Sequence, residues 1–336
     1  MNKNLVPYLR SPETGSELEL KAFATKDDDV LEGMLVDRAA NVWFRIEDGI
    51  ADLKPLALRT MERYQAFKQR RGLDDSLVAQ TPAAQDRTVA DQKKQINFFD
   101  GRPDEYEQEV VLSPFSRVLD NVTFGDWAKR TLKPGSRVLE VGCGSGRQTE
   151  VLLGLGMRSV ALDLSEGLLR IARRKLEAQG IEGRADLIAS SAEALPIADG
   201  SFDACVIYGS LHHFANPQAV LAKATAALRH GGYFYMLEPH KSPARFIFDW
   251  LMRVRPLWQE EAADDPLFSE SQFREWLGRG NVRADIKIST YLPPHLFYGI
   301  GQRSGERLLA WSDRLFSALP GVRRLGGVII AEGVKV

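Results

Sequence analysis

Three glycines at alternate positions, Gly142, Gly144 and Gly146, directly follow the apolar run Arg137–Val141. Glycine lets the backbone turn sharply and approach a ligand closely, because no Cβ stands in the way. A strand, a glycine loop and a following helix together predict a nucleotide-binding turn. The glycine loop alone does not say which nucleotide it would hold.

Two carboxylates near this loop narrow the choice of ligand. Asp163 ends the next apolar run, 21 positions after Gly142 (163 − 142), and at that spacing a carboxylate can accept both hydroxyls of a ribose. Glu140 would repel a pyrophosphate but attract a cationic amine. The charge pattern therefore favours a sulfonium amino-acid nucleoside over a dinucleotide.

Histidines are the candidate proton-transfer groups. His212 and His213 follow one apolar run and His240 follows the next, while His295 comes after a later run and His230 before the run that precedes His240. An imidazole, with a pKa of about 6.5, can take a proton from a hydroxyl at neutral pH. We take His212, His213 and His240 as candidate bases, His212 first, with packing or hydrogen bonding as the alternative role of each. No acidic residue stands at metal-ligand spacing from them, so no metal site is predicted.

The elements that must position these residues alternate between strand and helix. Helical patterns such as 166–179 and 217–228 separate most of the apolar runs. Short apolar strands alternating with helices predict an α/β, doubly wound, Rossmann-like fold with a seven-stranded, mostly parallel sheet covered on both faces. The predicted strands are 137–141, 159–163, 185–189, 204–208, 233–238, 284–291 and 327–336.

Several ordered motifs carry a family resemblance over about residues 95–240. Besides Val138–Gly146 they are Ser190–Pro196, Asp199–Asp203, Leu211–Phe214 and Leu228–Gly232, with Phe98–Tyr106 upstream as a lid segment. The chain thereby resembles the class I S-adenosylmethionine-dependent methyltransferases of the type 11-like group. The resemblance implies S-adenosylmethionine as the cofactor and S-adenosylhomocysteine as the product.

The resemblance also implies the cofactor-binding residues, matched position by position. It places the methionine moiety on the glycine loop, the ribose on the next strand end and the adenine beyond it. The methionine set is Glu140, Gly142, Cys143, Gly144 and Gly146; the ribose and adenine set is Asp163, Leu164, Ser191 and Ala192; and Tyr106 and Tyr208 complete the site. The family commonly has an acidic residue where this chain has Ser191, and a hydroxyl accepts the bond from the adenine amine more weakly.

The N-terminal part resembles a second family. Residues 5–54 resemble a small, β-rich, Trm112-like domain, but Ser11–Thr14 stands where members often have a zinc-binding Cys-x-x-Cys. No cysteine or histidine precedes Cys143, so thiolate zinc binding is excluded there. We expect this domain over 1–58, a linker with helix over 59–95, and the methyltransferase domain over 96–336. Docking and homodimerisation are hypotheses for the N-terminal domain, and a purely structural role is equally open.

The C-terminal part carries added helices, expected as lid insertions at about 241–280 and 292–326. Two apolar stripes at helical spacing run through them: Phe246, Ile247, Trp250, Leu251 and Val254, and then Leu308, Trp311, Leu315 and Leu319. They would pack on the domain, or cover an apolar substrate as a lid. With nearby arginines they would also allow peripheral membrane contact.

Composition and motifs together set the functional expectation. A net charge of −1 gives no long-range attraction for nucleic acid, and no signal or membrane-spanning stretch is visible, so we expect a cytoplasmic protein with Cys143 and Cys205 as free thiols. We predict methyl transfer to a small, apolar or lipid-like acceptor, on oxygen first and carbon next. The alternatives are modification of a translation component and a non-catalytic, cofactor-binding regulator. The sequence Tyr208–Leu211 lacks the Pro-Pro pair typical of enzymes that methylate planar amines, which disfavours base methylation.

Overall fold

The computed structural model of the chain describes residues 1–73, 87–257 and 266–336. Its strands are β1 (Glu19–Lys26), β2 (Asp29–Asp37), β3 (Val42–Glu47), β4 (Ile50–Asp52), β5 (Arg137–Val141), β6 (Arg158–Asp163), β7 (Ala185–Ala189), β8 (Phe202–Tyr208), β9 (Leu228–Pro239), β10 (Val282–Ser289) and β11 (Val328–Lys335). The predicted positions of all seven strands after residue 95 are close to these bounds.

The helices are α1 (Met61–Arg71), α2 (Arg87–Gly101), α3 (Pro103–Tyr106), α4 (Pro114–Asp120), α5 (Asp126–Thr131), α6 (Arg147–Gly154), α7 (Glu166–Gln179), α8 (Pro217–Ala226), α9 (Arg245–Val254), α10 (Glu270–Arg279) and α11 (Gln302–Ser317). Shorter 3₁₀ turns are Lys3–Tyr8, Leu56–Leu58, Glu182–Arg184, Ala192–Ala194, Leu211–His213 and Pro294–Gly299, and the segments Glu107–Val111 and Asn121–Gly125 are π-helical.

All strands of the described residues form one sheet of eleven, in the order β1-β2-β3-β4-β7-β6-β5-β8-β9-β11-β10. From β5 the chain builds outward through β6 and β7, then crosses to β8 on the other side of β5 and continues to β9. These neighbours pair in parallel, whereas β11 pairs antiparallel with both β9 and β10. This confirms an α/β Rossmann-like arrangement whose topological switch point lies between β5 and β8.

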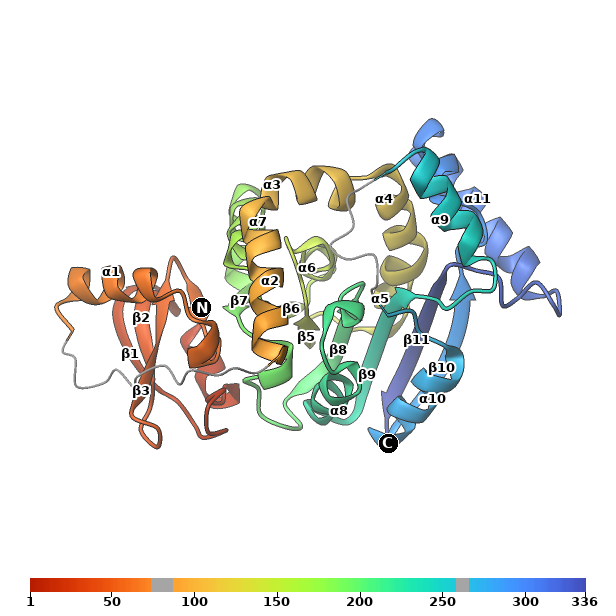
Figure 1. Cartoon of the computed structure of the whole chain (residues 1–336). Coiled ribbons are helices and arrows are strands. Elements are labelled where there is room, and N and C mark those ends of the chain that lie inside the picture. Colours follow the sequence, from red (N-terminus) through yellow and green to blue (C-terminus); the bar gives the residue numbers. More distant parts are fainter. Residues whose placement is uncertain (74–86, 258–265) are drawn as a thin grey trace.

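The predicted count of seven strands is too low. The N-terminal strands do not make a sheet of their own, because β4 pairs in parallel with β7 through Ile50–Leu187, Ala51–Ile188 and Asp52–Ala189. They extend the central sheet at one side, at the left of Figure 1. Sequence periodicity shows that a segment is a strand but not which exposed edge it joins, and this explains the difference.

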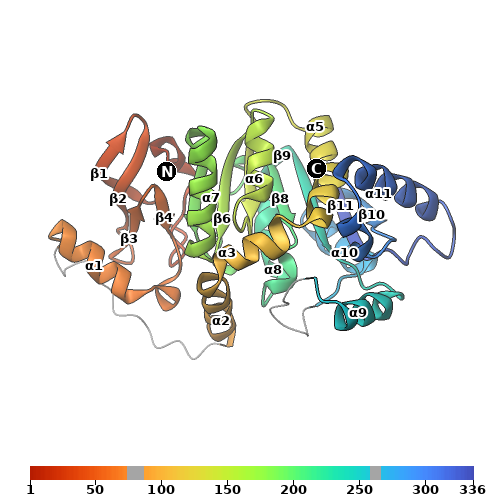
Figure 2. The same cartoon turned by 90° about the horizontal axis from the view of Figure 1, so that it is seen from above.

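Helices cover both faces of the sheet. On one side α6 and α7 pack on β6 and β7, and on the other α8 and α10 pack on β9 and β10, as Figure 2 shows from above. Alternate residues of a strand serve the two sides: Leu139 and Val141 join one apolar cluster, and Val138 joins another. Burial on both faces is the reason that these strands read as continuous apolar runs.

Local capping fixes where the helices at the carboxyl edge begin. The Ser165 side chain accepts the Leu168 N–H at the start of α7, and the Asn216 side chain accepts the Ala219 N–H at the start of α8, with Pro217 as the first helical residue. Two residues separate α7 from the end of β6, whereas residues 209–216, with the 3₁₀ turn Leu211–His213, join β8 to α8. Both connections lie at the carboxyl ends of parallel strands, the edge where a ligand would bind.

The predicted domain limits stay predictions, although the structure adds detail to them. Helix α2 runs across the expected boundary at residue 95, and parts of the expected linker (74–86) and of the first lid insertion (258–265) lie outside the described residues. Among the described residues, no helix has the length and apolar character needed to cross a bilayer.

Candidate active site

A cavity opens where the carboxyl ends of β5, β6, β7 and β8 meet the lid segment α2–α3. Gly142 and Gly144 of the glycine loop form its floor. The φ angles are positive at all three glycines of the loop, at 75° for Gly142, 55° for Gly144 and 79° for Gly146. A Cβ built on Gly142 would lie 2.4 Å from Cβ of Ser210, so only glycine fits there. The close approach of Ser210 therefore requires glycine at position 142.

Asp163 holds the loop to the next strand end. Its Oδ2 accepts the Gly144 N–H at 2.7 Å and its Oδ1 accepts the Ser165 N–H at 2.9 Å. Burial raises the pKa of Asp163 to about 6, while these backbone donors oppose the rise. Each carboxylate oxygen keeps a second lone pair, so the group can still accept the hydroxyls of a ribose.

Glu140 lies beneath the loop and does not line the cavity. The hydroxyl of Ser159 donates to one of its oxygens and that of Thr149 donates to the other at 3.2 Å, and burial raises its pKa to about 7. Glu140 thus links β5 to β6 and α6 through hydrogen bonds. Gly146 likewise lies outside the lining, as the N-cap of α6.

The acidic group missing at Ser191 is present two residues later. Ser191 is buried and donates to Oε2 of Glu193 at 3.0 Å, while Gln92 of α2 donates to the same oxygen at 2.6 Å. The cavity is lined by Glu193 and Ala192 but not by Ser191. Sequence reasoning passed over Glu193, although it stands inside a quoted motif; its carboxylate could have been noticed as the nearest one to the expected position.

The lid segment closes the cavity with aromatic rings. Phe99 of α2 packs edge-on against Tyr106 at 5.3 Å and against His213 at 5.8 Å, between ring centres. Glu107 then ties the lid to the floor, because the Ser145 hydroxyl donates to it and Lys175 donates to it at 2.9 Å. The predicted residues that line the cavity are Tyr106, Gly142, Cys143, Gly144, Asp163, Leu164, Ala192, Tyr208 and His213.

Only one of the three candidate bases lines the cavity. Burial lowers the pKa of His213 well below its usual value, so it is neutral at pH 7. His212 stacks beside it, with ring centres 4.0 Å apart. His240 does not line this cavity; its Nδ1 lies 2.8 Å from the Gly326 carbonyl oxygen, and its backbone bridges to Phe268, which is a structural role.

A buried carboxylate orients His212. Glu238 at the end of β9 is fully buried, and its Oε1 accepts the Ser210 and Leu211 N–H groups at 3.0 and 2.8 Å. Its Oε2 lies 2.7 Å from Nδ1 of His212. Because a carboxylate in this setting accepts, Nδ1 carries the hydrogen, and Nε2 is then the ring nitrogen that has a lone pair. Glu238 was not singled out from the sequence, because nothing in the chain shows that β9 ends beside the turn after β8.

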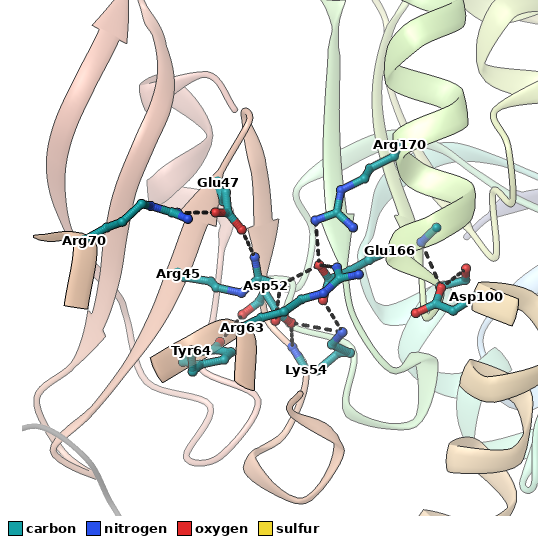
Figure 3. Close-up of polar contacts among 12 residues, drawn as sticks. Arg45, Glu47, Asp52, Lys54, Arg63, Tyr64, Arg70, Asp100, Glu166 and Arg170 are labelled. Atoms are coloured by element: carbon teal, nitrogen blue, oxygen red, sulfur yellow. Dashed lines mark hydrogen bonds and ion pairs between the residues drawn. The ribbon is translucent and has the colours of Figure 1, made fainter. Parts of the chain in front are cut away.

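Charged residues of the N-terminal part contact the start of α7, directly after Asp163. Figure 3 shows Glu166, the first residue of α7, at the centre of a buried charge cluster. Its carboxylate accepts from Arg45 at 2.5 Å, from Lys54 at 2.6 Å and from Arg63 at 2.7 Å. On the other side, Asp100 of α2 accepts the Ser165 hydroxyl at 2.5 Å and the Gly167 N–H at 2.8 Å. The start of α7, and with it Asp163, is therefore held by both the N-terminal strands and the lid helix.

Comparison with known proteins places this site in a family. The methyltransferase domain family matches residues 139–236. A ubiquinone biosynthesis O-methyltransferase of Xanthomonas axonopodis pv. citri is 32% identical over 195 residues, which are 56% of this chain and 80% of that protein. A namesake of Xanthomonas oryzae pv. oryzae is 34% identical over 187 residues, or 53% and 76%. The chain therefore belongs to the class I S-adenosylmethionine-dependent methyltransferases, and it is an enzyme that uses S-adenosylmethionine.

Two further proteins are also similar to this chain, one over a shorter match and one at low sequence identity. A demethylmenaquinone methyltransferase of Renibacterium salmoninarum is 32% identical over 156 residues, and the match spans 44% of this chain and 63% of that protein. The solved structure of an S-adenosylmethionine-dependent methyltransferase from Thermotoga maritima has 18% sequence identity and a TM-score of 0.49, covering 72% of this chain and 99% of that one. The resemblance of residues 5–54 to Trm112 is not tested by these matches and stays a prediction.

The cavity fits the cofactor on its own features. The floor approaches a ligand through glycine backbone that a Cβ would block, and Asp163 faces the cavity between the loop and the adenine end. Bound S-adenosylmethionine supplies a methyl group on a sulfonium centre, which is open to in-line attack. What the chain itself must supply is alignment, exclusion of water and removal of the acceptor's proton.

Proposed function

We propose that this enzyme methylates a hydroxyl oxygen of a small, apolar, lipid-like acceptor. The observation that carries the proposal is the pair His212–Glu238 beside the cavity. An oxygen nucleophile must lose a proton as its bond to the methyl carbon forms, and Nε2 of His212 can accept that proton while Glu238 orients the ring. The methyl group leaves sulfur for oxygen, and the proton passes from oxygen to nitrogen. Carbon is the second choice of acceptor atom.

Two further observations support an apolar acceptor. Relatives at 32 to 34% identity are named for ubiquinone biosynthesis and for demethylmenaquinone, and both names refer to quinones. Helix α9 has no buried residue, and it exposes Phe246, Trp250 and Val254 by 69, 60 and 66% on one side. An apolar face of this kind is typical of a surface that meets a lipid or a lipid-dissolved molecule.

The test is turnover with prenylated phenols and catechols, followed by mass spectrometry to locate the added methyl group. In His212→Asn and Glu238→Gln we expect kcat to fall by about 10²–10⁴-fold with little change in S-adenosylmethionine affinity, because general-base catalysis contributes about that much. His230→Gln is the matched control, since His230 is exposed at the distant start of β9. Unchanged kcat in His212→Asn would remove the proposed base.

Other outcomes of this screen have distinct meanings. Methyl groups found on carbon alone would replace O-methylation by C-methylation. Turnover of a ribosomal protein, translation factor or tRNA, with none of the phenols, would instead favour the translation-component alternative.

A further inference from the structure

Arg147 stands at the cavity with a hydrogen-bonding group unused. It is the first residue of α6, directly after the last glycine of the loop, and it lines the cavity. Its Nε pairs with Oδ2 of Asp120 at 3.1 Å, and Gln148 donates to the other Asp120 oxygen at 3.2 Å. Nη1 of Arg147 is buried and has no acceptor among the described residues. A buried, charged donor without an acceptor is costly, so its presence beside a cavity indicates an acceptor on the ligand.

The position of Arg147 matches one end of the cofactor. Along the sheet, β7 and β6 supply Ala192 and Asp163 at one end of the cavity, and β8 supplies Tyr208 at the other. The guanidinium carbon of Arg147 lies 5.2 Å from the centre of the Tyr208 ring, so Arg147 belongs to the second end. S-adenosylmethionine is elongated, with adenine and ribose at one end and its amino acid at the other. With the ribose at Asp163, the amino-acid group falls toward Tyr208 and Arg147.

Charge completes the assignment. Arg147 is the one lysine or arginine among the described residues that line the cavity, whereas Asp163 and Glu193 are acidic and burial lowers the pKa of His213 so that it stays neutral. The cofactor carries one anionic group, its carboxylate. We propose that Arg147 binds the amino-acid carboxylate of S-adenosylmethionine, with Asp120 and Gln148 orienting the guanidinium. This rests on the cofactor assignment and adds a recognition residue that sequence reasoning did not select.

The proposal is tested by binding, without turnover. Titration calorimetry compares S-adenosylmethionine with decarboxylated S-adenosylmethionine, which lacks only the carboxylate, and with 5′-methylthioadenosine, which lacks the amino acid. We expect Arg147→Gln to weaken binding of the intact cofactor by about 10- to 100-fold, as for a lost hydrogen bond between charged groups. Its affinity for the two truncated ligands should stay within about twofold of wild type, because they make no such bond. Arg147→Lys should recover part of the loss.

Controls separate the outcomes. Arg174→Gln removes an exposed arginine of α7 and should change none of the affinities. If Arg147→Gln fails to fold because Asp120 is left unpaired, Arg147→Gln/Asp120→Asn removes both charges and gives the same comparison.

Equal weakening of the binding of all three ligands would overturn the proposal in favour of a structural role. Unchanged cofactor binding with a raised acceptor KM would overturn it in favour of an acidic acceptor. Absence of S-adenosylmethionine binding by the folded wild type would instead contradict the cofactor site itself.

Discussion

Burial changes the chemistry of the residue that the sequence places at the end of the first methyltransferase strand. Glu140 is surrounded by β5, β6 and α6, and hydroxyl donors from Ser159 and Thr149 only partly replace the water that it has lost. Its pKa is raised from 4.5 to about 7, so folding takes up a proton in the range between about pH 4.5 and pH 7. The same isolation keeps this side chain from contacting a ligand in the cavity directly.

Glu140→Gln should therefore alter the pH dependence of stability. With the folded pKa above the unfolded one, the stability of the wild type falls as pH rises from about 4.5 to about 7 and is level beyond. The glutamine variant lacks that slope and should gain up to about 3 kcal/mol relative to wild type between pH 5 and pH 8.5, since one pKa unit is about 1.4 kcal/mol. Urea unfolding at pH 5 and at pH 8.5 measures this change in the free energy of unfolding. Glu177→Gln, at an exposed residue of α7, is the control. A parallel pH profile in the variant would contradict the assignment.

At the scale of elements, the added C-terminal helices differ in how far they are packed. Helix α11 buries Gly305, Leu309 and Ser312 against α4 and the neighbouring segments, yet its opposite side exposes Trp311 and Leu315. Helix α9 buries no residue. Exposed arginines flank these helices, namely Arg253, Arg255, Arg323 and Arg324. Most residues of the stripes predicted from helical spacing are therefore exposed, whereas Leu308 packs against the core. Peripheral contact with an anionic lipid surface remains our hypothesis for them.

Phe246→Ser/Trp250→Ser in α9 should reduce binding to phosphatidylglycerol vesicles by about tenfold or more, because burying one such ring contributes about 1.5–3 kcal/mol. Co-sedimentation with phosphatidylglycerol and with phosphatidylcholine vesicles measures the change. Met61→Ser, an exposed apolar residue of α1, serves as the control. Equal binding of wild type and variant would show that this face does not meet lipid.

At the scale of the whole molecule, the N-terminal strands are joined to the cofactor-binding half by hydrogen bonds and by charge. The β4–β7 pairing makes one sheet, and Glu166 accepts from Arg45 and Lys54, which are 2% and 1% exposed. The nearby cations hold the pKa of Glu166 well below its usual value. These contacts give this unit a role in fixing the start of α7.

Glu166→Gln should lower the free energy of unfolding by about 3–5 kcal/mol, because removing one partner leaves buried cations unpaired. It should also weaken S-adenosylmethionine binding, since Ser165 and Asp163 precede it directly. Denaturant unfolding and calorimetry measure the two effects. Arg274→Gln breaks an exposed pair with Glu270 and should change neither. Arg45→Met/Asp52→Leu/Lys54→Met/Glu166→Met, an apolar replacement that also removes the buried Asp52 paired with both cations, should restore stability. If it also restored full cofactor affinity, the cluster would be stabilising only.

Local sequence determined much of this protein. Apolar runs and glycine positions gave the strands from β5 on, the loop and Asp163, because strand formation, positive φ angles and caps depend on a few neighbouring residues. The family resemblance indicated the lid segment Phe98–Tyr106. Tertiary structure alone decided which strand the N-terminal unit joins, that Glu238 orients His212, and that Arg147 has a donor without an acceptor at the cavity. Each of these joins residues far apart in the chain, and no local pattern records such a meeting.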